Sequence, residues 1–313
     1  MNDSSFGIVF PGQGSQSVGM LSELAASHPI VNQTFSEATE ALGYDLWDLV
    51  QNGPKEILNQ TMKTQPAMLA AGVSVWRVWL DQGGRVPQLM AGHSLGEYTA
   101  LVCAGALEFA DAISLVAERG RFMQEAVPEG MGGMAAVLGL DDDQVKAVCA
   151  EAASGHVVEA VNFNSPGQVV IAGHKEAVER ACSLAKEAGA KRALPLPVSV
   201  PSHCVLMKPA ADRLAELLDR IVIAPPRISV IHNANVALAT DAASIRKQLA
   251  AQLYSPVRWV ETVQMMAASG VSSLVEAGPG KVLAGLTKRI ERSLNGLPVF
   301  DTKSLMQAQE TLK

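Results

Sequence analysis

A serine between two glycines offers the clearest chemistry in this sequence. The segment GHSLG at 92–96 matches the pattern G-x-S-x-G, in which a sharp turn between a strand and a helix exposes a serine hydroxyl. Apolar residues precede this segment and a helical pattern at 97–104 follows it. The start of that helix would direct free backbone N–H groups at an oxyanion. We therefore predict that Ser94 is a nucleophile; the alternative is a serine that only caps the helix.

A serine hydroxyl needs a general base, and the chain contains six histidines. We favour His203, because it follows the stiff, proline-containing segment 195–202. His232, at the end of a predicted strand, is a weaker candidate, and His93, beside the nucleophile, is expected to have a supporting role. The acidic residues between serine and histidine fall at predicted helix starts, so no acid for a triad is evident. A backbone carbonyl could instead receive the imidazole N–H, which would give a Ser-His dyad.

A glycine-rich loop, PGQGSQ at 11–16, follows the first apolar segment. Neither familiar phosphate loop fits it: Ser17 replaces the third glycine of a dinucleotide fingerprint, and Met20 replaces the lysine of a Walker A loop. An oxyanion hole takes one N–H from the residue after the nucleophile and one from another loop near the end of the sheet. Leu95 and Gln13 are the expected donors, and a purely structural turn is the alternative.

An arginine lies on the apolar face of a helix predicted at 107–126. Leu115 and Met123 are four residues either side of Arg119 and fall on the same face. A guanidinium buried there is costly unless it is paired. Its partner is either a protein carboxylate, such as that of Glu97, or a substrate carboxylate held by the planar fork of donors.

These groups require a scaffold, and strand patterns alternate with helical patterns along most of the chain. A strand at 6–10, a long helix at 64–80 and a strand at 89–92 are typical of an α/β fold with a parallel sheet covered on both faces. The main domain is expected to comprise residues 1–127 and 201–313.

The segment 128–200 has a different order, β-α-β-β-α-β, which is the pattern of a ferredoxin-like unit. A turn is expected at 164–167, where the sequence is Asn-Ser-Pro-Gly, and a final strand at 192–198. We predict that this small domain is inserted into the main one.

The composition excludes several classes of protein. With 313 residues, a net charge of −6 and 4% aromatic residues, the chain lacks the features of a nucleic-acid-binding protein. Its start has no basic and apolar signal segment, and no apolar run is long enough for a membrane span. The four cysteines are scattered, as expected for reduced thiols in a cytoplasmic protein.

Eight segments match one known family in order. They are VFPGQGSQ at 9–16, TQPA at 64–67, GHSLGEY at 92–98, RGRFMQEAVP at 119–128, NFNSPGQVVIAG at 162–173, VSVPSH at 198–203, QLYSPVRW at 252–259 and EAGPGKVL at 276–283. Together they resemble the malonyl-CoA:acyl carrier protein transacylase family. The resemblance implies an α/β-hydrolase-like core with the ferredoxin-like insert. It also implies ping-pong transfer of malonyl from malonyl-CoA to the phosphopantetheine thiol of acyl carrier protein, without a metal or other cofactor.

The resemblance also implies roles for individual residues. Ser94 is the nucleophile, His203 is the base, and the backbone carbonyl of Gln252 orients the histidine. Arg119 resembles the arginine that holds the malonyl carboxylate. The oxyanion-hole positions are Gln13 and Leu95. The pocket positions with lesser roles are Gln65, Asn162 and His93.

Two other classes remain open at this point. A serine thioesterase or esterase could use the same strand-turn-helix motif around the serine, called the nucleophile elbow, if water reached the acyl-enzyme. A non-catalytic binding protein could retain the fold. The carrier protein of this family is acidic, so a local basic patch is a hypothesis for this chain, which is itself expected to be a monomer; the alternative for each candidate is an ordinary solvated surface residue. The candidates for the patch are Lys191, Arg192, Lys281, Lys288 and Arg289.

Overall fold

Strand β1 (Phe6–Phe10) lies at the centre of a parallel sheet, and all five of its residues are buried. The computed structural model describes residues 5–198 and 200–313. The strand order is β7-β2-β1-β8-β9, and each neighbouring pair is parallel. The other strands are β2 (Leu89–Gly92), β7 (Ser229–Ile231), β8 (Ser273–Ala277) and β9 (Asn295–Val299). The predicted parallel sheet of an α/β fold is confirmed.

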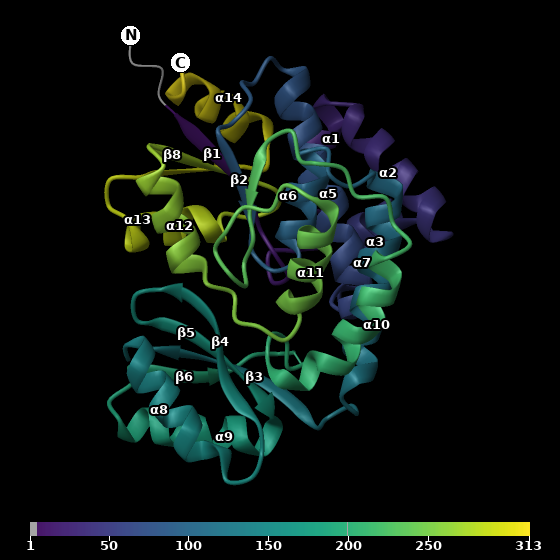
Figure 1. Cartoon of the computed structure of the whole chain (residues 1–313). Helices are drawn as coiled ribbons and strands as arrows, with labels where there is room; N and C mark the ends of the chain where they lie inside the picture. The colour runs from purple at the N-terminus through teal and green to yellow at the C-terminus, as the bar shows by residue number, and fades with distance from the viewer. Residues whose placement is uncertain (1–4, 199) are drawn as a thin grey trace.

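Helices cover both faces of this sheet (Figure 1). Because successive strand residues point to opposite faces, Ile8 and Phe10 of β1 pack in one core cluster and Val9 packs in another. Helices of the first cluster are α1 (Ser22–Ser27), α2 (Ile30–Leu42), α3 (Leu46–Asn52), α4 (Lys55–Leu58), α5 (Thr61–Asp81), α6 (Gly96–Cys103), α7 (Phe109–Ala126), α10 (Lys208–Leu218), α11 (Ala242–Gln252) and α14 (Thr302–Thr311). Those of the second are α12 (Trp259–Ala268) and α13 (Val282–Ile290).

A second, antiparallel sheet has the order β4-β5-β3-β6 and a core of its own. Its elements are β3 (Gly132–Leu138), α8 (Asp142–Ala153), β4 (Val158–Ser165), β5 (Gln168–His174), α9 (Lys175–Glu187) and β6 (Arg192–Pro195). This is the β-α-β-β-α-β order that the sequence predicts. Helix α8 begins with a capping box, in which the Asp141 carboxylate accepts a hydrogen bond from the backbone N–H of Gln144.

Two predicted boundaries in this region are wrong. The turn predicted at 164–167 is shorter, because β4 continues to Ser165 and only two residues separate it from β5. The strand predicted at 192–198 ends at Pro195, since the prolines at 195 and 197 supply no N–H for the ladder. Within the stiff segment predicted at 195–202, residue 199 lies outside the described residues, as do residues 1–4 at the start of the chain.

Backbone hydrogen bonds join the second sheet to the loop that precedes α12. The N–H of Val257 donates to the carbonyl of Val161 at 2.8 Å, and the N–H of Phe163 donates to the carbonyl of Val257 at 3.1 Å. In the part of the chain that is described, no helix is long and apolar enough to cross a membrane. The same residues contain no cluster of three or more metal-binding side chains, and all four cysteines are free thiols.

Candidate active site

The turn between β2 and α6 carries Ser94, whose φ of +52° lies in the left-handed region. Close backbone packing requires glycine on both sides of it. A Cβ on Gly92 would lie 1.9 Å from the carbonyl carbon of Gly96, and a Cβ on Gly96 would lie 2.1 Å from the carbonyl oxygen of Phe10. The two glycines of the motif therefore let the chain turn sharply and leave the serine at the carboxyl end of the parallel sheet.

His203 lies between Ser94 and a backbone carbonyl. Its Nε2 is 2.8 Å from Ser94 Oγ, and its Nδ1 is 2.8 Å from the carbonyl oxygen of Gln252. Because a carbonyl oxygen only accepts, Nδ1 carries the hydrogen and Nε2 presents a lone pair to the hydroxyl. Burial, and then the charge of Arg119, lower the pKa of His203 to about 3. The imidazole is therefore unprotonated and able to accept a proton at neutral pH.

Arg119 on α7 is 1% exposed and directs its guanidinium toward the same serine. Nη1 donates to Gln65 Oε1 at 2.8 Å, Nη2 donates to Gln252 Oε1 at 2.9 Å, and Nη2 also lies 3.4 Å from Ser94 Oγ. Its Nε has no hydrogen-bond partner and no carboxylate forms an ion pair with it, as far as residues 5–198 and 200–313 are concerned. Among the same residues, Glu97, one of the partners considered from the sequence, forms neither an ion pair nor a hydrogen bond with it. The guanidinium also lies 5.2 Å from the centre of the Tyr98 ring, so its neighbours here are uncharged groups, and a buried cation in such a setting can accept a carboxylate.

A pocket opens over Ser94, His203 and Arg119. Its apolar wall consists of Met123, Met134, Leu196, Val198 and Val200. The pocket is also lined by all the remaining predicted positions except Gln252, namely Gln13, Gln65, His93, Leu95 and Asn162. Since Met134 and Asn162 lie on strands of the antiparallel sheet, the pocket is formed between the two sheets of the protein. Gln252 lies behind the pocket, where its carbonyl reaches the histidine.

The two predicted oxyanion donors, Gln13 and Leu95, line the same pocket as the nucleophile. Leu95 immediately precedes α6, and Gln13 belongs to the loop after β1. The Gln13 side chain places its Nε2 3.5 Å from the hydroxyl of Thr61. Their backbone N–H groups remain the predicted donors.

His93 connects the elbow to the second sheet. Its Nε2 lies 2.8 Å from Asn164 Oδ1 on β4, and its ring packs at 5.6 Å from that of Trp259. Burial lowers the pKa of His93, and the hydrogen bond to Asn164 partly opposes this effect. These contacts fit the supporting role predicted for His93 rather than that of a base.

Sequence reasoning missed a buried network beneath the pocket. Glu97 accepts hydrogen bonds from His232 Nδ1 at 2.7 Å and from the backbone N–H of Asn233 at 2.9 Å. His232, the weaker candidate for the base, is therefore engaged with a carboxylate and has no hydrogen bond to Ser94 among the described atoms. The available signal was a glutamate three residues after the serine, on an otherwise apolar helix.

Comparisons with known proteins agree with this geometry. The model of the acyl transferase domain family matches residues 8–310. A malonyl CoA-acyl carrier protein transacylase of Salmonella typhimurium is 62% identical over 305 residues, which cover 97% of this chain and 99% of that protein. A crystal structure of an acyl carrier protein S-malonyltransferase from Vibrio cholerae is 61% identical, with a TM-score of 0.95, and covers 97% of this chain and 100% of that one.

A further solved structure holds a type II PKS acyl-carrier protein in complex with its malonyl-transacylase. The similar chain is 59% identical, with a TM-score of 0.97, and the match covers 98% of this chain and 100% of that one. Similarity at this level extends through the elbow, the pocket and both sheets. The chain therefore belongs to the acyl transferase family and, within it, to the malonyl CoA-acyl carrier protein transacylases.

Proposed function

We propose that this chain transfers a malonyl group from malonyl-CoA to the phosphopantetheine thiol of acyl carrier protein, through an ester on Ser94, and so supplies malonyl units for fatty acid synthesis. The observation that carries the proposal is the buried guanidinium of Arg119, which lies 3.4 Å from the serine oxygen and donates to the neutral amides of Gln65 and Gln252. A malonyl group has a carboxylate two carbons from the reacting carbonyl, so it can reach Arg119 while its thioester faces Ser94. The names of the related proteins support the same substrate and partner.

In the first half-reaction, Ser94 Oγ attacks the thioester carbonyl while His203 Nε2 takes the hydroxyl proton. The backbone N–H groups of Gln13 and Leu95 stabilise the oxyanion of the tetrahedral intermediate. The C–S bond then breaks, and the leaving CoA sulfur takes the proton from His203. The malonyl group remains as an ester on the serine.

The second half-reaction repeats these steps in reverse order. The carrier protein's thiol loses its proton to His203 Nε2 and attacks the ester carbonyl, and Ser94 leaves with that proton. Both thiols have an ordinary pKa of about 8.5, so one thioester replaces another at nearly equal free energy. The residues present supply each proton transfer, and the proposed reaction requires no cofactor.

We further propose an α/β-hydrolase-like core of residues 1–127 and 201–313 with a ferredoxin-like domain at 128–200. The strand order β4-β5-β3-β6 and the separate core of the antiparallel sheet support the second part. We propose that the protein acts as a monomer in the cytoplasm, and its free, mostly buried thiols are consistent with a reducing compartment.

Intact mass measurement tests the proposed function. The full chain is mixed with malonyl-CoA, weighed, and then given acyl carrier protein with its phosphopantetheine arm. We expect a stable malonyl adduct that moves to the carrier protein, and no adduct on the Ser94→Ala variant. Loss of the adduct to water at the same rate with and without carrier protein would identify a hydrolase instead. Absence of any adduct would contradict the serine mechanism.

A further inference from the structure

A buried hydrogen-bond network centred on Glu97 lies directly beneath the candidate site. We propose that Glu97 is a positioning residue that holds both the nucleophile and the carboxylate-binding arginine, through Asn233 and Gln252 respectively. The inference rests on the proposed function, because it assigns a role to a residue that serves the same site. Glu97 does not line the pocket, so it acts only through the residues that it binds.

The carboxylate of Glu97 is fully buried, and within the described chain neither a lysine nor an arginine pairs with it. Three donors satisfy it: His232 Nδ1 at 2.7 Å, the backbone N–H of Asn233 at 2.9 Å and Gln252 Nε2 at 2.8 Å. A buried carboxylate is tolerated when several donors converge on it. Because the carboxylate only accepts, it also fixes which way each of these donors points.

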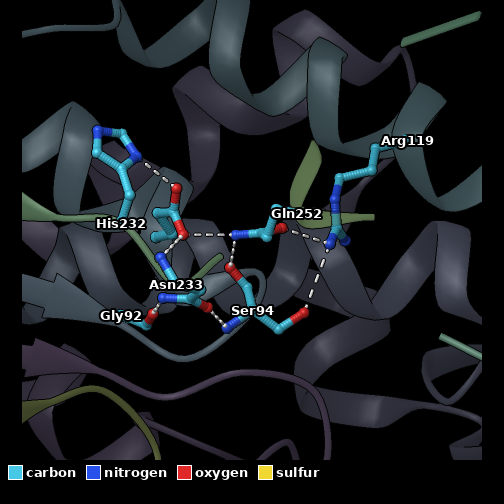
Figure 2. Close-up of polar contacts among 7 residues, drawn as sticks. Gly92, Ser94, Arg119, His232, Asn233 and Gln252 are labelled. Atoms are coloured by element: carbon cyan, nitrogen blue, oxygen red, sulfur yellow. Dashed lines mark hydrogen bonds and ion pairs between the residues drawn. The ribbon is translucent and has the colours of Figure 1, made fainter. Parts of the chain in front are cut away.

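The first branch of the network holds the elbow. Asn233 Nδ2 donates to the carbonyl of Gly92 at 2.7 Å, and Asn233 Oδ1 accepts from the backbone N–H of Ser94 at 2.7 Å (Figure 2). Asn233 follows β7, the neighbour of β2, so its side chain extends the pairing of the two strands by one step. A serine with positive φ persists only where its surroundings determine its conformation, and this clamp does so.

The second branch holds the guanidinium. Figure 2 shows Gln252 between Ser94 and Arg119. Its Nε2 donates to Glu97 and to the carbonyl of Ser94 at 3.0 Å, and its Oε1 accepts from Arg119 Nη2 at 2.9 Å. If the amide were reversed, its oxygen would face the carboxylate and its NH₂ would face the guanidinium, so the partners fix its orientation. Glu97 therefore determines that Gln252 offers an oxygen to Arg119.

The two branches predict different effects on the reaction. Loss of the Asn233 clamp misplaces the serine and should slow loading of every acyl group by a similar factor. Loss of the Gln252 amide frees Arg119 and should reduce malonyl loading more than acetyl loading, since only malonyl has a carboxylate for the arginine. Loss of Glu97 should have both effects. A role in stability alone predicts none of these differences between substrates.

The test measures single-turnover loading of the full chain from malonyl-CoA and from acetyl-CoA, per mole of folded protein. Glu97→Leu should lower malonyl loading by about 100-fold, the typical cost of misplacing a reacting group by an ångström. It should also lower the malonyl-to-acetyl preference by about tenfold, as expected when a hydrogen bond to a charged group is lost. Asn233→Leu should slow both substrates equally, and Gln252→Met should lower the preference.

Glu97→Gln is the matched control. Its amide oxygen can accept from Asn233 and Gln252, while its NH₂ faces His232, whose Nδ1 becomes an acceptor when the hydrogen moves to Nε2. We therefore expect it to restore most of the loading and the preference. If Glu97→Leu does not fold, Asn233→Leu and Gln252→Met still test the proposal, because each leaves Glu97 with at least two of its donors.

Normal malonyl loading by the native chain, together with unchanged loading and preference in Glu97→Leu, would overturn this inference alone. Equal changes in preference in Asn233→Leu and Gln252→Met would overturn the division into branches. Failure of the native chain to load malonyl would instead refute the proposed function.

Discussion

Replacement of Arg119 by methionine tests the charge at the centre of the site. Methionine retains an apolar stem of similar length but removes the guanidinium that binds Gln65 and Gln252 and approaches Ser94. The change affects both the substrate's carboxylate and the pKa of the base. The two effects can be measured separately.

The effect on malonyl transfer can be estimated from the burial of Arg119. Removal of one partner from a buried ion pair costs about 3 kcal/mol or more. Since about 1.4 kcal/mol corresponds to a tenfold change in rate, kcat/KM for malonyl-CoA should fall by roughly 150-fold. An acetyl group has no carboxylate and gains a less polar pocket, so its loading should be retained or should increase.

The effect on the base is a change in the pKa of His203, which alters how the loading rate depends on pH. Burial is the main cause of the low pKa of His203, about 3, and the charge of Arg119 is the second. Without that charge the pKa should rise from about 3 toward the ordinary value of 6.5. Because the unprotonated imidazole is the base, the acid limb of kcat/KM for acetyl-CoA should move to higher pH in Arg119→Met.

Both effects can be followed by the rate of acyl-enzyme formation between pH 4 and 9, with acetyl-CoA and malonyl-CoA in parallel. Arg119→Lys is the control, because it retains the charge but not the planar fork. It should keep the acid limb low and lose only part of the malonyl preference. An unchanged malonyl-to-acetyl ratio in Arg119→Met would refute the carboxylate-binding role, and an unshifted acid limb would refute the electrostatic argument.

The pKa of His203 is about 3 in the folded chain and 6.5 in the unfolded chain, so the unfolded chain takes up the proton first and the stability of the fold decreases as pH falls from 6.5 to about 3. In His203→Gln, Tm should decrease less over this pH range. An equal dependence of Tm on pH in the two proteins would contradict the assignment. Gly96→Ala places a Cβ 2.1 Å from the Phe10 carbonyl oxygen, whereas Gly285→Ala on α13 meets no atom within 4 Å; circular dichroism melting and serine loading should be impaired only in the first. Lys288→Glu should raise KM for acyl carrier protein without changing loading from malonyl-CoA, and an unchanged KM would exclude this residue from the basic patch.

The reacting groups could be predicted because their signals are local. The elbow is encoded in five consecutive residues, and Arg119 is recognisable from its place on a single helix face. The carbonyl that orients His203 could be assigned to Gln252 only by family resemblance, because a backbone carbonyl leaves no trace in residue type. The partners of Glu97 lie 135 to 155 positions away, so no local pattern connects them.

The missed elements have equally physical reasons. Strand β9 contains Gly296 and Pro298, which disfavour strands, but it lies at the edge of the sheet, where a missing N–H is tolerated. Helices α1, α3 and α4 are each seven residues or shorter, too short for a clear helical period. The boundaries of the antiparallel sheet were displaced by two or three residues where proline or a tight turn ends a strand.

The neutral carbonyl behind His203 bears on the choice between thiol and water as the second nucleophile. In triads, a carboxylate at this position stabilises the imidazolium that forms during attack. Here the Gln252 carbonyl offers only a dipole, and Arg119 opposes the positive charge, so the histidine is a weak base. A thiol, with a pKa near 8.5, gives up its proton to such a base far more readily than water, with a pKa of about 15.7. Under the proposed mechanism we therefore expect this pair to favour a thiol over an unpositioned water as the second nucleophile, whereas the weakly acidic Ser94 hydroxyl is deprotonated because it is held 2.8 Å from His203 Nε2.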